Sequence, residues 1–162
     1  MGFEDGEYDW PVSVDDFDVT HIAVTMRTLK LSPDTEALLR TLAGAPSRCM
    51  SRGELTRALG RVNLKVVNAI LSEFAVTLIA LLNDGLPSMQ TWHPLDAVVQ
   101  IVPEATVGRA TRPDDFAFVM RTKLAKALAA NGIAPYVELS PRLQHFLPDD
   151  VDRVDEYPPD LL

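Results

Sequence analysis

The residues best suited to chemistry are basic and amide side chains between residues 40 and 72. Residues 40–65 hold six Arg or Lys residues against one acidic residue, Glu54, a net charge of +5 in a chain of net charge −8. Clustered cations bind phosphates, and an Asn side chain can read adenine through two hydrogen bonds. The pattern predicts a nucleic-acid surface that includes Arg48, Arg52, Arg57, Arg61 and Lys65. Alternatively, these charges coat the solvated faces of small helices.

Catalytic patterns are scarce. His21, His93 and His145 lie far apart, so no two of them have metal-ligand spacing such as a His pair at i and i+4. The chain has no phosphate-binding glycine loop, no CxxC motif and no GxSxG motif. We therefore predict no catalytic residue, no metal and no cofactor, and expect a protein that is not an enzyme.

Two other features allow both a chemical and a structural interpretation. Cys49 stands between Arg48 and Met50 just before a predicted helix, where cations and a helix N-terminus favour a reactive thiolate. Asp114 and Asp115 could form a carboxylate pair, but acidic residues at a helix start also complement the helix dipole. The structural interpretation is favoured for both.

Start and stop signals predict three helices that position the basic residues. Pro33 after Ser32 suits a first helix, which Gly44 and Pro46 end. Ser51-Arg52-Gly53-Glu54 has the pattern of a capping box for a second helix, which Gly60 ends. Asn63 is a suitable cap for a third helix that runs to about residue 83. Two helices split by a short turn with glycine form a helix-turn-helix, whose second helix normally enters the major groove.

The flanking segments predict short strands and one more helix. Alternation over His21–Leu31 predicts a strand, and Ala97–Val102 predicts another that could pair with Met89–Trp92 as a β-hairpin. A helix is predicted from Thr111 or Arg112, with Pro113 in its first position, to Asn131–Gly132. Tyr136–Leu139 suggests a last short strand, and the residues from Ser140 on look irregular. The fold class expected is α+β, mainly helical.

The third helix is unusually apolar and must be buried on most sides. Its second half, from Val76 to Leu82, has Thr77 as its one polar residue. We expect either the helix at 113–131 or a second copy of the protein to cover it. This need for cover favours a homodimer.

The arrangement resembles the winged helix-turn-helix superfamily over roughly residues 20–103. The resemblance rests on LSPDTEALLRTLAG, MSRGELTRALG and VNLKVVNAILSEF, followed by MQTWHPLDAVVQIV. SRGELTRALG is similar to the second helix and turn of bacterial DNA-binding regulators and of some restriction-associated modules. The resemblance implies duplex DNA as partner, often bound by dimers, although a sizeable minority of the superfamily binds only proteins. It would place Arg52 and Arg57 near phosphates, with Lys65, Asn68 and Ser72 facing the groove.

The charge map suggests four parts. Residues 1–18 carry −7 and look flexible, although Trp10 and Phe17 could dock, and residues 149–162 carry −5. The two ends together carry −12. Because the whole chain carries −8, residues 19–148 carry +4. We expect acidic arms at 1–18 and 149–162, a winged-helix core at 19–103 and a helical extension at 104–148. The arms could aid solubility, compete with DNA or engage a basic partner protein.

The chain has no apolar run of 18 residues and no signal-peptide pattern, which predicts a cytoplasmic protein with no membrane partner. Its single cysteine is compatible with a reducing compartment. Two hypotheses follow. In the first, the chain is a DNA-binding regulator or DNA-associated accessory factor. In the second, it is a non-catalytic module that binds a partner protein.

Overall fold

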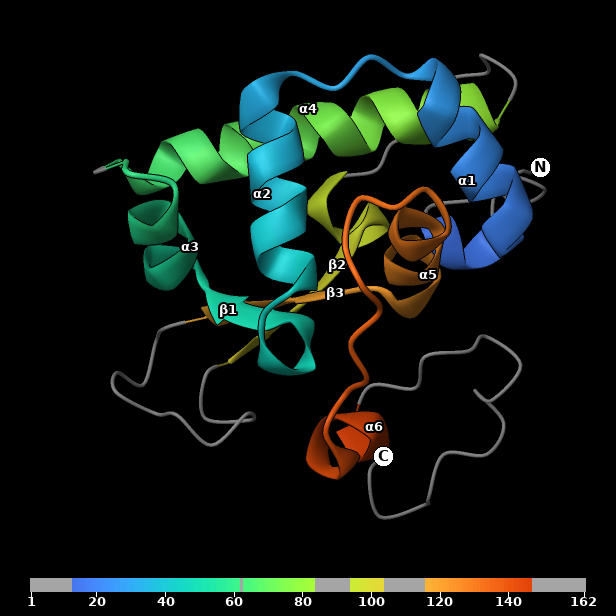
Figure 1. The fold of residues 1–162 in the computed structure, drawn as a ribbon. Coiled ribbons are helices and arrows are strands. Elements are labelled where there is room, and N and C mark those ends of the chain that lie inside the picture. The colour runs from blue at the N-terminus through green and yellow to red at the C-terminus, as the bar shows by residue number, and fades with distance from the viewer. Residues whose placement is uncertain (1–12, 62, 84–93, 104–115, 147–162) are drawn as a thin grey trace, which may run out of the picture.

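The computed structural model describes residues 13–61, 63–83, 94–103 and 116–146 (Figure 1). These residues form a mainly helical structure with one three-stranded antiparallel sheet, which confirms the α+β class. In chain order the elements are η2 (Val14–Asp16), α1 (Val19–Thr28), α2 (Pro33–Ala43), η3 (Pro46–Arg48), β1 (Cys49–Ser51), α3 (Arg52–Ala58), α4 (Leu64–Leu82), η4 (Pro94–Ala97), β2 (Val99–Pro103), β3 (Phe116–Met120), α5 (Thr122–Ala130) and α6 (Pro141–Phe146).

The three predicted helices are α2, α3 and α4, and the predicted caps are all formed. Ser32 Oγ accepts a hydrogen bond from the Thr35 amide at 3.1 Å. In the capping box, the Glu54 amide donates to Ser51 Oγ, and the Ser51 amide donates to a Glu54 carboxylate oxygen. Each cap satisfies amides that the first helical turn leaves unpaired, which explains why the sequence located these starts so well.

The sheet has the strand order β1-β3-β2, so β3 is its central strand. Val119 lies opposite Cys49 on one side and Gln100 on the other. The segment after residue 103 therefore supplies the middle of the sheet, between two strands from the predicted core. β2 pairs with β3. Met89–Trp92, the predicted hairpin partner of Ala97–Val102, lies outside the described residues.

A helix was predicted to begin at Thr111 or Arg112, and this prediction is wrong for the residues of β3. Residues 116–120 form a strand, and the helix begins only at Thr122. Ala117, Phe118, Val119 and Met120 are all buried, because the strand has neighbours at both edges and packing on both faces. A strand buried on both faces reads as a continuous apolar run, which periodicity cannot distinguish from a buried helix. The predicted helix end is right, since α5 stops before Asn131 and Gly132 has φ 73°.

Residues 19–28 form a helix, and the predicted strand at His21–Leu31 is wrong. Ile22, Ala23 and Met26 are buried and share one helical face, whereas Val24 is 46% exposed. β-branched residues are frequent in this segment and favour a strand locally. Packing of the helical face against α4 and α5 overrides that preference.

Two apolar clusters cover the two faces of the sheet. Phe118 and Met120 join the main core with the helices α1, α2, α4 and α5. Cys49, Val119 and Val102 face the other way and pack with Leu139 and Leu143. Figure 1 shows α6 on the side of the sheet away from α4. The C-terminal segment, which was expected to be irregular, therefore forms a short helix that covers the second face.

The segment between α5 and α6 forms no strand, contrary to the prediction for Tyr136–Leu139. Two of its backbone carbonyls accept hydrogen bonds from arginine side chains. Arg40 Nε donates to the Ile133 carbonyl at 3.2 Å, and an Arg48 nitrogen donates to the Val137 carbonyl. A backbone satisfied by side chains needs no sheet partner.

α4 is the longest helix described, and Figure 1 shows α2 crossing it, with α3 near its start and α1 near its end. It packs against α1, α2, α3 and η4, and its buried residues share the main core with those of α5. Residues 65–82 are long and apolar enough to cross a bilayer, with a mean hydropathy of 1.8, but 39% of that stretch is buried within the fold. This packing is consistent with a core helix of a soluble protein.

Part of the predicted N-terminal arm is docked on the core. Val14 is fully buried, and Phe17 is half-buried against the main core, as expected for Phe17. Asp15 and Arg121 form a largely buried ion pair of 2.8 Å, with side chains 13% and 14% exposed. Burial raises the pKa of the Asp15 carboxyl above its ordinary 3.8, against the opposing charge of Arg121.

The raised pKa of Asp15 predicts how stability depends on pH. A carboxyl with a raised pKa in the folded state stabilises fully below its unfolded pKa, and this contribution is lost as the pH rises through the folded pKa. The free energy of unfolding of wild type, minus that of Asp15→Asn, should therefore fall as the pH rises from the ordinary pKa of 3.8 through the higher pKa of the folded state. Urea denaturation at several pH values measures this difference. If this difference instead grows with pH, the charge of Arg121 outweighs the effect of burial, and the pKa of Asp15 is lowered.

Candidate nucleic-acid interface

The α3–turn–α4 unit presents three of the predicted cations to solvent. Arg52 and Arg57 belong to α3, Lys65 lies in the first turn of α4, and all three are exposed. The turn is fixed by Gly60, whose φ of 71° suits glycine, and by Asn63, whose Oδ1 accepts from the Lys65 amide at 2.9 Å. Within the described part of the chain, no carboxylate forms an ion pair with any of these three cations.

Arg48 was predicted to lie on the DNA-binding surface, but its side chain is fully buried. Nε donates to the Met120 carbonyl at 3.1 Å and another nitrogen donates to Thr122 Oγ1 at 2.6 Å. The guanidinium also lies 5.2 Å from the ring centre of Tyr136. These contacts join η3, the end of β3 and the start of α5, so Arg48 supports the fold and has no free edge for a phosphate.

The backbone around Arg48 explains this inward direction. Ser47 and Arg48 have φ values of 56° and 54°, in the left-handed region that residues other than glycine rarely adopt. The Arg48 amide donates to the Ala45 carbonyl at 2.8 Å, and the Ser140 amide donates to Ser47 Oγ at 3.0 Å. This strained turn aims the side chain into the protein.

Two further cations of the basic segment are engaged within the protein. Arg61 pairs with Asp34 at 2.6 Å, and Arg40 pairs with Glu36 at 2.5 Å. Both acids lie in the first turn of α2, outside the segment in which the sequence analysis counted charge. A charge count extended to the neighbouring helix would have found them. Within the basic segment at 40–65, the exposed cations with no described acidic partner are therefore Arg52, Arg57 and Lys65.

Asn68 and Ser72 are half-buried on α4, on the side of the helix that also carries Lys65. Asn68 Oδ1 is buried and accepts no hydrogen bond within the described structure. In this conformation Asn68 lacks the exposed acceptor that a bidentate contact with adenine requires. The residue after Ser72, Glu73, is exposed and would repel a phosphate placed beside it.

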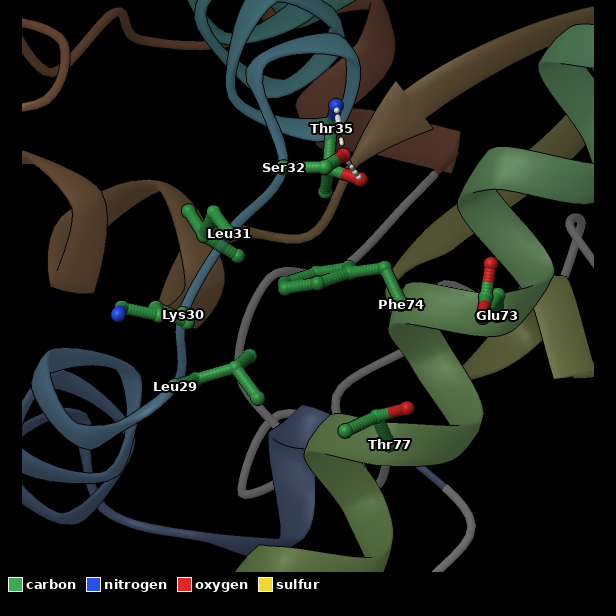
Figure 2. Close-up of a pocket in the computed structure, with 8 residues that line it drawn as sticks. All are labelled: Leu29, Lys30, Leu31, Ser32, Thr35, Glu73, Phe74 and Thr77. Atoms are coloured by element: carbon green, nitrogen blue, oxygen red, sulfur yellow. Dashed lines mark hydrogen bonds between the residues drawn. The ribbon is translucent and has the colours of Figure 1, made fainter.

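A recess of about 170 Å³ lies on another side of α4, between this helix and the α1–α2 connection. Figure 2 shows the Phe74 ring projecting into it from α4, opposite Leu29 and Leu31, while the Lys30 side chain points away. Ser32 and Thr35 border it with hydroxyls that bond to each other at 2.8 Å. Apolar and polar side chains both line the recess, and none of the predicted DNA-binding residues is among them.

The remaining chemical candidates find structural roles or lie outside the described residues. Cys49 is buried in the apolar cluster behind the sheet, and His21 packs edge-on against Phe17 with ring centres 5.7 Å apart. His93, Asp114 and Asp115 lie outside the described residues. Among the residues described, no three His, Cys, Asp or Glu side chains gather as a metal site would require.

Comparison of the chain with protein-family models, with curated proteins and with solved structures found no match.

Proposed function

We propose that this protein is a winged helix-turn-helix protein that binds duplex DNA, as a transcriptional regulator or DNA-associated accessory factor. The observation that carries the proposal is the element order α2-β1-α3-α4-β2-β3 with sheet order β1-β3-β2, combined with exposed Arg52, Arg57 and Lys65 on α3 and α4. This order supports a helix-turn-helix followed by a β-hairpin. Exposed cations at both ends of α3 and at the start of α4 suit phosphates beside a groove.

In this proposal α4 is the recognition helix. Lys65, Asn68 and Ser72 share the face that would enter the major groove, and Arg52 and Arg57 contact phosphates on one border of it. Because Asn68 presents no exposed acceptor and the contacts are few, phosphate binding dominates and base reading is weak. The proposal includes a homodimer, a cytoplasmic location and no catalytic activity.

Fluorescence anisotropy of a labelled mixed-sequence duplex, titrated with the full chain at several salt concentrations, tests the proposal. Contacts to phosphates release counterions, so the affinity should fall steeply as salt rises. No binding at micromolar protein in low salt would contradict the proposal.

A second function, a module that binds a partner protein, is favoured by the apolar surface of α4. Val76 and Leu81 are 55% and 43% exposed, and the recess lined by Phe74 offers a cup for an apolar side chain. Thr77→Arg would introduce a long charged side chain at that recess without touching Arg52, Arg57 or Lys65. In capture experiments with the full chain, this second function predicts a partner that Thr77→Arg loses. Retention of that partner would argue against use of the recess.

A further inference from the structure

The ion pair between Asp34 and Arg61 connects two elements that the proposed interface would place beside DNA. Asp34 lies in the first turn of α2, and Arg61 lies in the turn between α3 and α4. Arg61 Nη2 donates to Asp34 Oδ2 at 2.6 Å, and the side chains remain 41% and 58% exposed, respectively. The pair is therefore formed at the surface, where another anion can reach the same guanidinium.

The backbone of Arg61 is held in place independently of its side chain. The Arg61 amide donates to the Thr56 carbonyl at 3.0 Å, and Gly60 with its positive φ closes α3 just before it. Arg61 also lies just before the start of α4 and follows Arg57 by four residues. The side chain can therefore change partner while the turn keeps its shape.

Carboxylate and phosphate compete for arginine because both offer paired oxygens that match the guanidinium fork. An exposed ion pair of this kind is weak, so a phosphate held nearby by Arg52, Arg57 and Lys65 can displace the carboxylate. Breaking the pair nevertheless costs part of the binding energy. It also leaves the negative charge of Asp34 close to the bound phosphate.

We propose that Asp34 is an intramolecular competitor of DNA: it occupies Arg61 in the free protein and lowers the affinity for phosphates at the α3–α4 turn. The inference rests on the proposed function and adds a regulating residue to it. Arg61 then belongs to the interface only when DNA displaces Asp34. The simpler structural view, in which the pair only fastens α2 to the turn, predicts no change in DNA affinity beyond that caused by net charge.

The test compares Asp34→Asn with Glu36→Gln in the full chain, with the labelled duplex over a range of salt concentrations. Both variants remove one negative charge from the first turn of α2, but Glu36 pairs with Arg40 and not with Arg61. Asp34→Asn should tighten binding by about two- to fivefold, because no carboxylate has to leave Arg61, and it should keep the wild-type salt slope, because Arg61 contacts phosphate in both complexes. Glu36→Gln should tighten binding less, because it leaves Arg61 paired with Asp34.

A third variant, Arg61→Ala with Asp34→Asn, separates the two explanations. The affinity of this double variant should differ from that of Arg61→Ala alone by no more than the affinity of Glu36→Gln differs from that of wild type. Salt-sensitive binding by wild type, with Asp34→Asn and Glu36→Gln indistinguishable, would overturn this inference and leave the proposed function standing. If neither wild type nor Asp34→Asn binds the duplex, both proposals are contradicted. Binding by Asp34→Asn alone would support both.

Discussion

Replacing Arg48 by methionine is expected to lower the free energy of unfolding by about 3 to 5 kcal/mol. Methionine keeps much of the length of the side chain but removes every donor. The carbonyls of Met120 and Val137 and the hydroxyl of Thr122 then lose their bonds to the guanidinium inside the protein. Buried acceptors without donors cost far more than the bonds themselves contribute. Chemical denaturation followed by circular dichroism measures the loss.

Arg40→Met is the matched control for this experiment. Arg40 also bonds a carbonyl of the segment after α5, that of Ile133, but its side chain is 57% exposed and its ion pair with Glu36 is solvated. Water replaces the lost contacts there, so the expected loss is about 0 to 1 kcal/mol. Equal effects of the two substitutions would contradict the structural role assigned to Arg48. A folded Arg48→Met variant with normal stability but impaired DNA binding would restore Arg48 to the interface.

Replacing Arg52, Arg57 and Lys65 together by alanine is expected to weaken duplex binding by about a hundredfold or more at moderate salt. Loss of three phosphate contacts should also flatten the salt slope by about 2.7. The three side chains are exposed and have no described acidic partner, so the fold should keep its stability. Anisotropy titrations at matched salt concentrations, together with a denaturation curve, give both quantities.

A second triple variant, Lys30, Lys126 and Arg142 to alanine, controls for net charge. These residues are also exposed, but they lie on the α1–α2 connection, on α5 and on α6. Long-range attraction alone predicts similar losses for both triple variants, whereas contact at the α3–α4 unit predicts a large loss for the first only. Similar losses would move the interface away from α3 and α4.

The helices that carry the candidate site could be predicted because their boundaries depend on local chemistry. Ser32, Ser51 and Asn63 each bond an amide two or three residues away, and such contacts are visible in the order of residues alone. The predicted end of α5 at Asn131 and Gly132 was right for the same reason. The long apolar helix α4 was also correctly located, because a segment with so many apolar residues must be buried and a helix can bury it on most sides.

The errors arose where contacts between distant residues decide the outcome. Phe116–Met120 is a strand because two other strands flank it, and residues 19–28 are helical because α4 and α5 cover one side of them. Arg48 was counted as a surface cation because it belongs to the basic segment at 40–65, yet two of its partners lie more than 70 residues away. The acids that engage Arg40 and Arg61 come from the start of α2. The charge count over residues 40–65 therefore overestimated the number of exposed cations that have no acidic partner.

A titration of the ¹⁵N-labelled full chain with an unlabelled mixed-sequence duplex, followed through backbone amide signals, tests the proposed interface most directly. The proposal predicts the largest shifts in α3 and over residues 60–72, with smaller shifts in α5 and α6, and their loss at high salt. Shifts centred on Leu29–Thr35, Phe74 and Thr77 would place the ligand at the recess and contradict the DNA-binding surface proposed for α3 and α4. An unchanged spectrum at saturating duplex in low salt would contradict DNA binding itself.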